Sequence, residues 1–88
     1  MQTFKIYALF DKKAKAYIYP HFFKQHGEAI RALEDTVNES QNQNQVSKHP
    51  ADFALCYIGD FTDGTGLVTG LNAPVVIQEA VSLKADAK

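Results

Sequence analysis

The chain has 88 residues, 45% of them hydrophobic, with one cysteine and a formal net charge of −1. This length supports a single small core, so we expect one domain over residues 1–84 and a disordered tail at 85–88. A lone cysteine excludes an internal disulfide, and the apolar stretches are far shorter than the roughly 20 residues that span a membrane. The sequence therefore predicts a soluble protein of a reducing compartment, with no membrane partner.

The charge is unevenly distributed along the chain. Residues 1–31 carry six cations and two acids, a net charge of +4, whereas residues 32–88 carry three cations and eight acids, a net charge of −5. A basic first part is compatible with a phosphate-facing surface, but the acidic remainder argues against an extended nucleic-acid footprint. An ordinary solvated face is the other interpretation.

The first predicted elements are two strands that pair as a hairpin. Residues 3–10 alternate in hydrophobicity, which is typical of a strand with one buried face. The alternation separates a first face of Phe4, Ile6, Ala8 and Phe10 from a second face of Lys5, Tyr7 and Leu9. Residues 11–15 form a polar turn, and residues 16–19 return as the second strand. Pro20 is expected to end the pairing because it has no N–H to donate.

A helix is predicted over residues 28–40. Ile30, Leu33 and Val37 recur at helical spacing and form one apolar stripe. Glu28 lies in the first turn, where a carboxylate interacts favourably with the helix dipole. The Asn- and Gln-rich run that follows indicates a poorly ordered loop.

The second half of the chain predicts two further strands. His49-Pro50 favours extended geometry, and residues 52–58 carry apolar groups on both faces, as a central strand does. Residues 59–61 continue this strand to a tight turn at Asp63-Gly64, whose glycine is expected to supply positive φ. The fourth strand begins at residues 67–68.

Beyond Pro74 the apolar positions fit neither period well, and we expect a short extended piece at 75–77 followed by a short helix at 78–84. The expected fold class is α+β. It consists of a single antiparallel sheet of about four strands, in the order strand, strand, helix, strand, strand. One main helix packs on a face of this sheet.

No motif with catalytic or metal-binding spacing is found. Residues 64–66 resemble the start of a dinucleotide-binding fingerprint, but they lead into a predicted strand and not into a helix. In the calcium-loop register set by Gly64, the first and third ligand positions are Gly59 and Phe61, which have no chelating side chains. Cys56 lies in the middle of a strand, where a thiol usually packs as a small hydrophobe. We therefore expect a protein that is not an enzyme and has no metal or cofactor.

Cations and aromatic rings interleave in the first hairpin and its exit, a mixture typical of proteins that bind single-stranded nucleic acid. The predicted nucleic-acid-binding residues are Lys5, Lys12, Lys13, Lys15, Tyr17, Tyr19, Phe22 and Lys24. The lysines are expected to contact phosphates and the rings to stack on bases. Tyr7 is expected to join Lys5 on an exposed surface of the sheet. The plain alternative is that the aromatic residues seal the helix against the sheet while the lysines solubilise a turn.

Four segments, at residues 6–14, 19–23, 28–32 and 48–66, give the chain a resemblance to a known family. In order and spacing they are similar to the small nonstructural protein of gokushovirus-type microviruses, which are bacteriophages with circular single-stranded DNA. The likeness covers about residues 4 to 76. It implies a DNA-binding protein without catalytic residues that acts in viral DNA replication or genome packaging, in the cytoplasm of the infected bacterial host.

The alternative function is a protein-interaction adaptor, dimeric through an exposed sheet edge, that recruits viral replication or capsid proteins without contacting DNA. The expected partners are therefore single-stranded DNA, such viral proteins, or a second copy of the chain. A salt titration of DNA binding separates the two functions, because each phosphate contact adds to the salt dependence.

Overall fold

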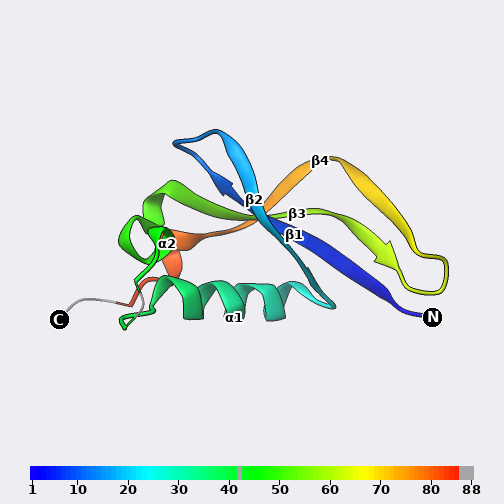
Figure 1. The fold of residues 1–88 in the computed structure, drawn as a ribbon, viewed down its shortest axis with the longest axis horizontal. Helices are drawn as coiled ribbons and strands as arrows, with labels where there is room; N and C mark the ends of the chain where they lie inside the picture. The colour runs from blue at the N-terminus through cyan, green and yellow to red at the C-terminus, as the bar shows by residue number, and fades with distance from the viewer. Residues whose placement is uncertain (42, 86–88) are drawn as a thin grey trace.

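The computed structural model describes residues 1–41 and 43–85, which form a four-stranded antiparallel sheet with one long helix beneath it (Figure 1). The strands are β1 (Thr3–Asp11), β2 (Ala16–Phe23), β3 (Phe53–Thr62) and β4 (Leu67–Glu79), in the spatial order β2-β1-β3-β4. Helix α1 (His26–Val37) follows β2 in sequence and covers one face of the sheet. The predicted α+β class and the order strand, strand, helix, strand, strand are confirmed.

Three short helical turns complete the fold: α2 (Gln45–Lys48), η1 (Pro50–Asp52) and η2 (Ala80–Leu83). Asn44 caps α2 by accepting a hydrogen bond from the Ser47 backbone N–H at 2.9 Å. The expectation of extended geometry around Pro50 is wrong, because this proline begins η1, where a missing N–H leaves no hydrogen bond unmade. The shorter η2 replaces the helix predicted over 78–84. None of the helices in the described part of the chain is long and apolar enough to cross a membrane.

Helix α1 begins at His26, earlier than predicted, because Glu28 organises the N-terminus. The carboxylate Oε1 of Glu28 accepts hydrogen bonds from the backbone N–H groups of Lys24 and Gln25, at 3.0 and 3.2 Å. These contacts satisfy donors that a helix start leaves without partners. The helix ends at Val37, before the predicted boundary, where an asparagine follows.

The hydrophobic core lies between α1 and the sheet. Tyr7 and Leu9 of β1 join Phe53 and Leu55 of β3 in this core, where they meet Leu33 of α1. The expectation of an exposed Tyr7 is wrong, since only 1% of this residue is exposed. Alternation separates the two faces of a strand, but both faces of β1 are apolar, so tertiary packing decides which face the helix covers.

Both edge strands are interrupted at a proline. In β2 the pairing with β1 shifts at Tyr19 and Pro20 and then resumes, so the prediction that the proline ends the pairing is wrong. An edge strand tolerates proline because the missing N–H is not needed for a ladder bond. In β4, residues 71–74 bulge opposite Ile58, and the extended piece predicted at 75–77 is part of the same strand.

Two glycines allow the β3–β4 hairpin to close. Gly66, at φ 71, is the left-handed residue of the turn, so the expected role of Gly64 is wrong. The Gly66 N–H donates to the Thr62 carbonyl at 2.8 Å. At Gly59 a Cβ would lie 2.7 Å from the Thr69 carbonyl oxygen, so a residue with a side chain would push the two strands apart.

The C-terminal segment is fastened to the end of α1. Lys84 Nζ donates hydrogen bonds to the carbonyl oxygens of Val37 and Ser47, at 3.1 and 3.2 Å. A cation in this position also interacts favourably with the negative end of the helix dipole. The Ala85 N–H is hydrogen-bonded as well. The rest of the predicted tail, residues 86–88, lies outside the described residues.

Candidate nucleic-acid interface

The turn between β1 and β2 is built around Asp11. Its side-chain Oδ1 accepts hydrogen bonds from the backbone N–H groups of Lys13 and Ala14, at 3.0 and 3.1 Å, and its carbonyl oxygen accepts one from the Lys15 N–H at 2.7 Å. Aspartate suits this position because its short side chain satisfies the backbone of the residues that follow. Lys15 closes the turn at φ 57, in the left-handed region that favours glycine. The turn therefore presents lysine side chains at the tip of the hairpin.

The three lysines of this turn have different surroundings. Lys12 Nζ lies 2.7 Å from Glu79 Oε1 and also donates to the Ala51 carbonyl at 3.4 Å, so it ties the turn to the end of β4. Both partners of this ion pair are about two-fifths exposed, so we expect it to be weak and screened by salt. The side chains of Lys13 and Lys15 make no hydrogen bond or ion pair to the described residues. These two ammonium groups are available to an anion.

Two of the predicted aromatic residues lie on the sheet face that α1 leaves uncovered, which we call the open face. The Tyr17 ring packs against Phe10, with centroids 4.8 Å apart, and the Phe22 ring meets Phe61 edge-on at 5.8 Å. Strand register places Tyr17 opposite Phe10 and Phe22 opposite Ile6, on the same side of β1. Both rings are about half exposed.

Lys24 and Lys5 lie apart from these two rings. Lys24 Nζ is 5.8 Å from the ring centroid of Phe4, at one end of the open face. Lys5 pairs in register with Asp60 and lies on the α1 side of the sheet, in alternation with Tyr7. The structure thus divides the eight predicted residues among the turn, the open face and the α1 side, and does not gather them on one surface.

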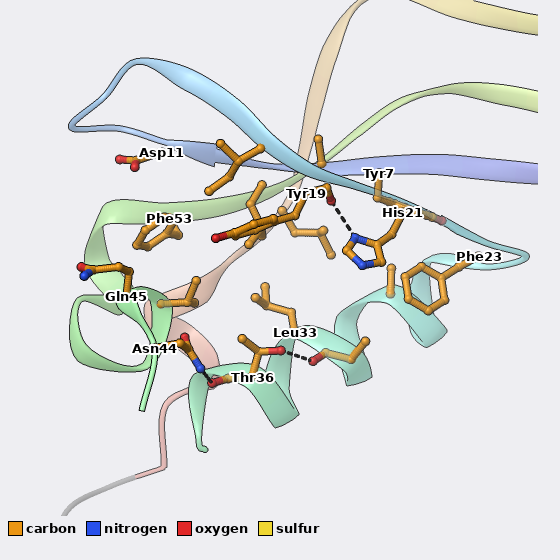
Figure 2. Close-up of a pocket in the computed structure, with 17 residues that line it drawn as sticks. Tyr7, Asp11, Tyr19, His21, Phe23, Leu33, Thr36, Asn44, Gln45 and Phe53 are labelled. Carbon is orange, nitrogen blue, oxygen red and sulfur yellow. Dashed lines mark hydrogen bonds between the residues drawn. The ribbon is translucent and has the colours of Figure 1, made fainter. Parts of the chain in front are cut away.

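A groove of about 440 Å³ opens between the β1–β2 hairpin and the two helices α1 and α2 (Figure 2). Its walls are mostly apolar, and they include Ile18, Leu33 and Phe53. Polar side chains are supplied by Asp11, Tyr19, His21, Thr36, Asn44 and Gln45. Apolar walls with a few polar groups, in a volume of about 300 to 1,000 Å³, are typical of sites that bind small ligands.

Tyr19 is placed over this groove by the bulge in β2. Its φ is 55, and the ring nitrogen Nδ1 of His21 lies 2.6 Å from the Tyr19 carbonyl oxygen, to which it donates. Figure 2 shows the Tyr19 ring across the groove, between Phe53 and His21. The residue is nevertheless 62% exposed, so its ring is open to a stacking partner. The residue that departs from strand geometry is therefore the one that reaches the groove.

Two buried or half-buried phenols flank the N-terminus of α1. The Tyr7 hydroxyl lies 2.7 Å from Nδ1 of His26, and the Tyr57 hydroxyl donates to Asp60 Oδ1 at 2.6 Å. Burial raises the pKa of Tyr7 above its ordinary value. The hydrogen bond to Asp60, followed by burial, raises the pKa of Tyr57 to about 12. Both phenols stay protonated at neutral pH and act as hydrogen-bonding groups of the core.

The structure bears on the other chemical candidates as well. Cys56 is 1% exposed, as its mid-strand position predicted, and burial raises the pKa of its thiol. A buried thiol with a raised pKa is a poor nucleophile. Among residues 1–41 and 43–85, no group of three or more His, Cys, Asp or Glu side chains is placed to hold a metal ion.

The sequence interpretation missed the groove. Asn44 and Gln45 come from a run that composition marks as a loop, yet they cap and begin α2 at the mouth of the groove. Thr36 contributes from the far side, on α1. No local pattern places these three positions beside β2, because the contact depends on how the α1–α2 connection folds back.

Comparison with known proteins identifies the family. Residues 4–83 match the family model described as phage ORF5 protein. Protein ORF5 of Chlamydia phage 1 is 34% identical over 74 residues, which cover 80% of this chain and 75% of that protein. No solved structure matches the chain significantly. The phage origin implied by the resemblance is confirmed, and the chain belongs to the phage ORF5 protein family of the Microviridae.

Proposed function

We propose that this protein binds single-stranded DNA without catalysis, through its β1–β2 hairpin, during replication or packaging of the viral genome in the cytoplasm of the infected host. One observation carries the proposal. Within the described residues, Lys15 and Tyr19 are the two non-glycine residues at positive φ. Such a conformation costs about 1–2 kcal/mol for a residue with a side chain. Backbone strain of this kind concentrates at functional sites.

The strained residues are of the two types that such binding requires. Lys15 is a cation at the tip of the hairpin, with Lys13 beside it, and neither side chain is engaged by the described protein. Tyr19 is an exposed ring over an apolar groove on the same hairpin. The lysines supply phosphate contacts, and Tyr19 supplies a stacking face for a base that enters the groove. Family membership in a virus group with single-stranded DNA supports the same interpretation.

The charge limits the strength of binding. Two or three lysines can neutralise two or three phosphates, so log Kd should rise with log salt concentration with a slope of about 1.4 to 2. The net charge of −1 adds no further attraction. We therefore expect weak binding that depends on salt, with a preference for single strands because a duplex does not present an unstacked base to the groove.

A fluorescence-anisotropy titration of labelled single-stranded and duplex oligonucleotides, at several salt concentrations, tests the proposal. The double variant Lys13→Ala/Lys15→Ala should weaken single-strand binding about tenfold and flatten the salt slope. Tyr19→Leu should weaken binding about tenfold while leaving the salt slope unchanged, since stacking on one base contributes about 1–3 kcal/mol. The matched control is Arg31→Ala/Lys48→Ala, which removes two exposed cations from α1 and α2.

Two outcomes would overturn the proposal. In the first, the hairpin double variant and its control weaken single-strand binding equally. Binding would then depend on the overall charge of the protein and not on the hairpin. The other is the absence of salt-dependent binding together with co-purification of a viral replication or capsid protein that survives nuclease and high salt. That second result would support the adaptor function.

A further inference from the structure

The open face of the sheet is apolar and has no covering element. Strand register places large apolar side chains on it, among them Phe4, Tyr17, Phe22, Phe61, Val68 and Val76. Phe22, Val68 and Val76 are 53%, 64% and 55% exposed. Helix α1 lies on the opposite side (Figure 1). Contiguous exposed apolar patches are uncommon on monomers and mark interaction sites.

The open face is also poor in charge. The strands contain four charged residues, and register places Lys5, Asp11 and Asp60 on the α1 side. The fourth, Glu79, pairs with Ala54 and so lies on the open face, but at its end, where it forms an ion pair with Lys12. Depletion of charge at the centre is characteristic of protein interfaces, whereas nucleic-acid surfaces need cations there. The chemistry of this face therefore fits an apolar protein surface.

The sheet edges are poorly suited to strand addition. Pro20 interrupts β2 at its bulge, and Pro74 lies in the bulge of β4. Prolines and bulges on edge strands prevent pairing with another chain, because the edge no longer presents a regular row of N–H and C=O groups. A partner of this protein is therefore expected to approach through the open face and not through an edge.

The molecule exposes more surface than a compact monomer of the same mass. The accessible surface is 5894 Å², against about 5,200 Å² for a compact monomer of this mass. The radius of gyration is 13.7 Å, against about 12 Å for a compact domain of this length. The molecule is therefore more extended than a compact domain of its length, with principal-axis extents of 48 × 24 × 19 Å.

We propose that the open face is the interface of a homodimer, in which two sheets pack face to face about a twofold axis with their α1 helices outside. A second copy fits because a twofold interface joins a patch to itself, and a patch without central charge meets its copy without repulsion. In this dimer Tyr17 and Phe22 are interface residues, and the β1–β2 turns remain free.

Two neighbouring valines provide a matched test. Val76 pairs with Cys56 on the open face, whereas Val75 pairs with Tyr57 on the α1 side. They are 55% and 49% exposed, so a glutamate at either position is solvated in the monomer. Sedimentation equilibrium of the full chain without DNA should give twice the monomer mass of 9.8 kDa. Val76→Glu should weaken dimerisation at least about tenfold by burying charge at the interface, while Val75→Glu should leave it unchanged.

Far-UV circular dichroism of both variants checks that each one folds. A wild-type chain that stays monomeric at the highest attainable concentration would overturn the proposal. So would a dimer that persists in Val76→Glu, because an edge or another face would then be the interface. Loss of the dimer in Val75→Glu to the same extent would also contradict it, since only the open face is proposed to be buried. Because no DNA is present, this result is independent of the proposed DNA binding.

Discussion

The β1–β2 and β3–β4 hairpins have the same construction, yet their turns differ in chemistry. Each closes through four residues, 12–15 and 63–66, whose last member is left-handed. That member is Lys15 in the first hairpin and Gly66 in the second. Glycine adopts this conformation without strain, whereas lysine is strained in it. The second turn therefore meets only the conformational requirement of the backbone. The first turn places a cation in a strained conformation, which indicates a role for the lysine side chain.

The two hairpins also differ in their support. The first is anchored on the α1 side by Tyr7 and Leu9, which are buried in the core. The second extends away from the helix, and Leu67 and Val68 beside its turn are each 64% exposed (Figure 1). The first hairpin is therefore held against the core beside its turn, whereas the turn end of the second hairpin lies beyond the helix and keeps exposed apolar side chains.

The largest expected effect tests this difference in support. Leu33→Ala removes a 4%-exposed side chain from beneath the sheet and should lower the free energy of unfolding by about 3 kcal/mol. Leu67→Ala, at the far end of the second hairpin, should change it by about 0.5 kcal/mol or less. Urea denaturation at a low protein concentration measures both. Equal losses would show that the second hairpin is packed as tightly as the first.

The next effect tests the two turns. Gly66→Ala should cost about 1 kcal/mol, because a Cβ there meets no atom within 4 Å and only backbone strain is added. Lys15→Gly should stabilise the chain by up to about 1 kcal/mol by relieving the same strain, while weakening single-stranded DNA binding. Thermal denaturation measures the change in stability, and fluorescence anisotropy measures the change in DNA affinity. A Lys15→Gly variant that gains stability without losing affinity would remove the functional reason for the strained lysine.

The smallest expected effect concerns the pKa values of two tyrosines, Tyr57 in the second hairpin and Tyr7 in the first. The hydrogen bond to Asp60 raises the pKa of Tyr57 from 10.0 to about 12, so the folded state holds this proton more tightly than the unfolded state. This contribution to stability is complete below pH 10 and is lost as the pH rises towards 12. Tyr57→Phe should therefore make the stability profile flatter above pH 10.

Tyr7 of the first hairpin provides the comparison, because burial and not a carboxylate is the main cause of its raised pKa. Asp60→Asn should lower the pKa of Tyr57 and leave that of Tyr7 high. Phenolate absorbance followed during a pH titration measures both groups. If Asp60→Asn leaves the titration above pH 10 unchanged, the hydrogen bond is not the dominant cause.

Local sequence patterns were sufficient for the elements of the fold. The alternation at 3–10 gave β1 and the apolar stripe from Ile30 to Val37 gave α1, because both patterns repeat within a few neighbouring residues. They failed at Pro20, where pairing resumes after a bulge. There the outcome depended on β2 being an edge strand, and edge position is a property of the whole sheet.

The sequence by itself determined the strand and helix order, the basic turn of the first hairpin and the absence of a recognisable catalytic motif. The tertiary structure decided which face of β1 the helix covers, and with it that Tyr7 is buried while Phe22 is half exposed. It also placed Tyr19 over a groove formed by residues distant in sequence. The physical reason is that periodicity reports which side chains share a face, whereas burial requires a second element whose position local interactions do not specify.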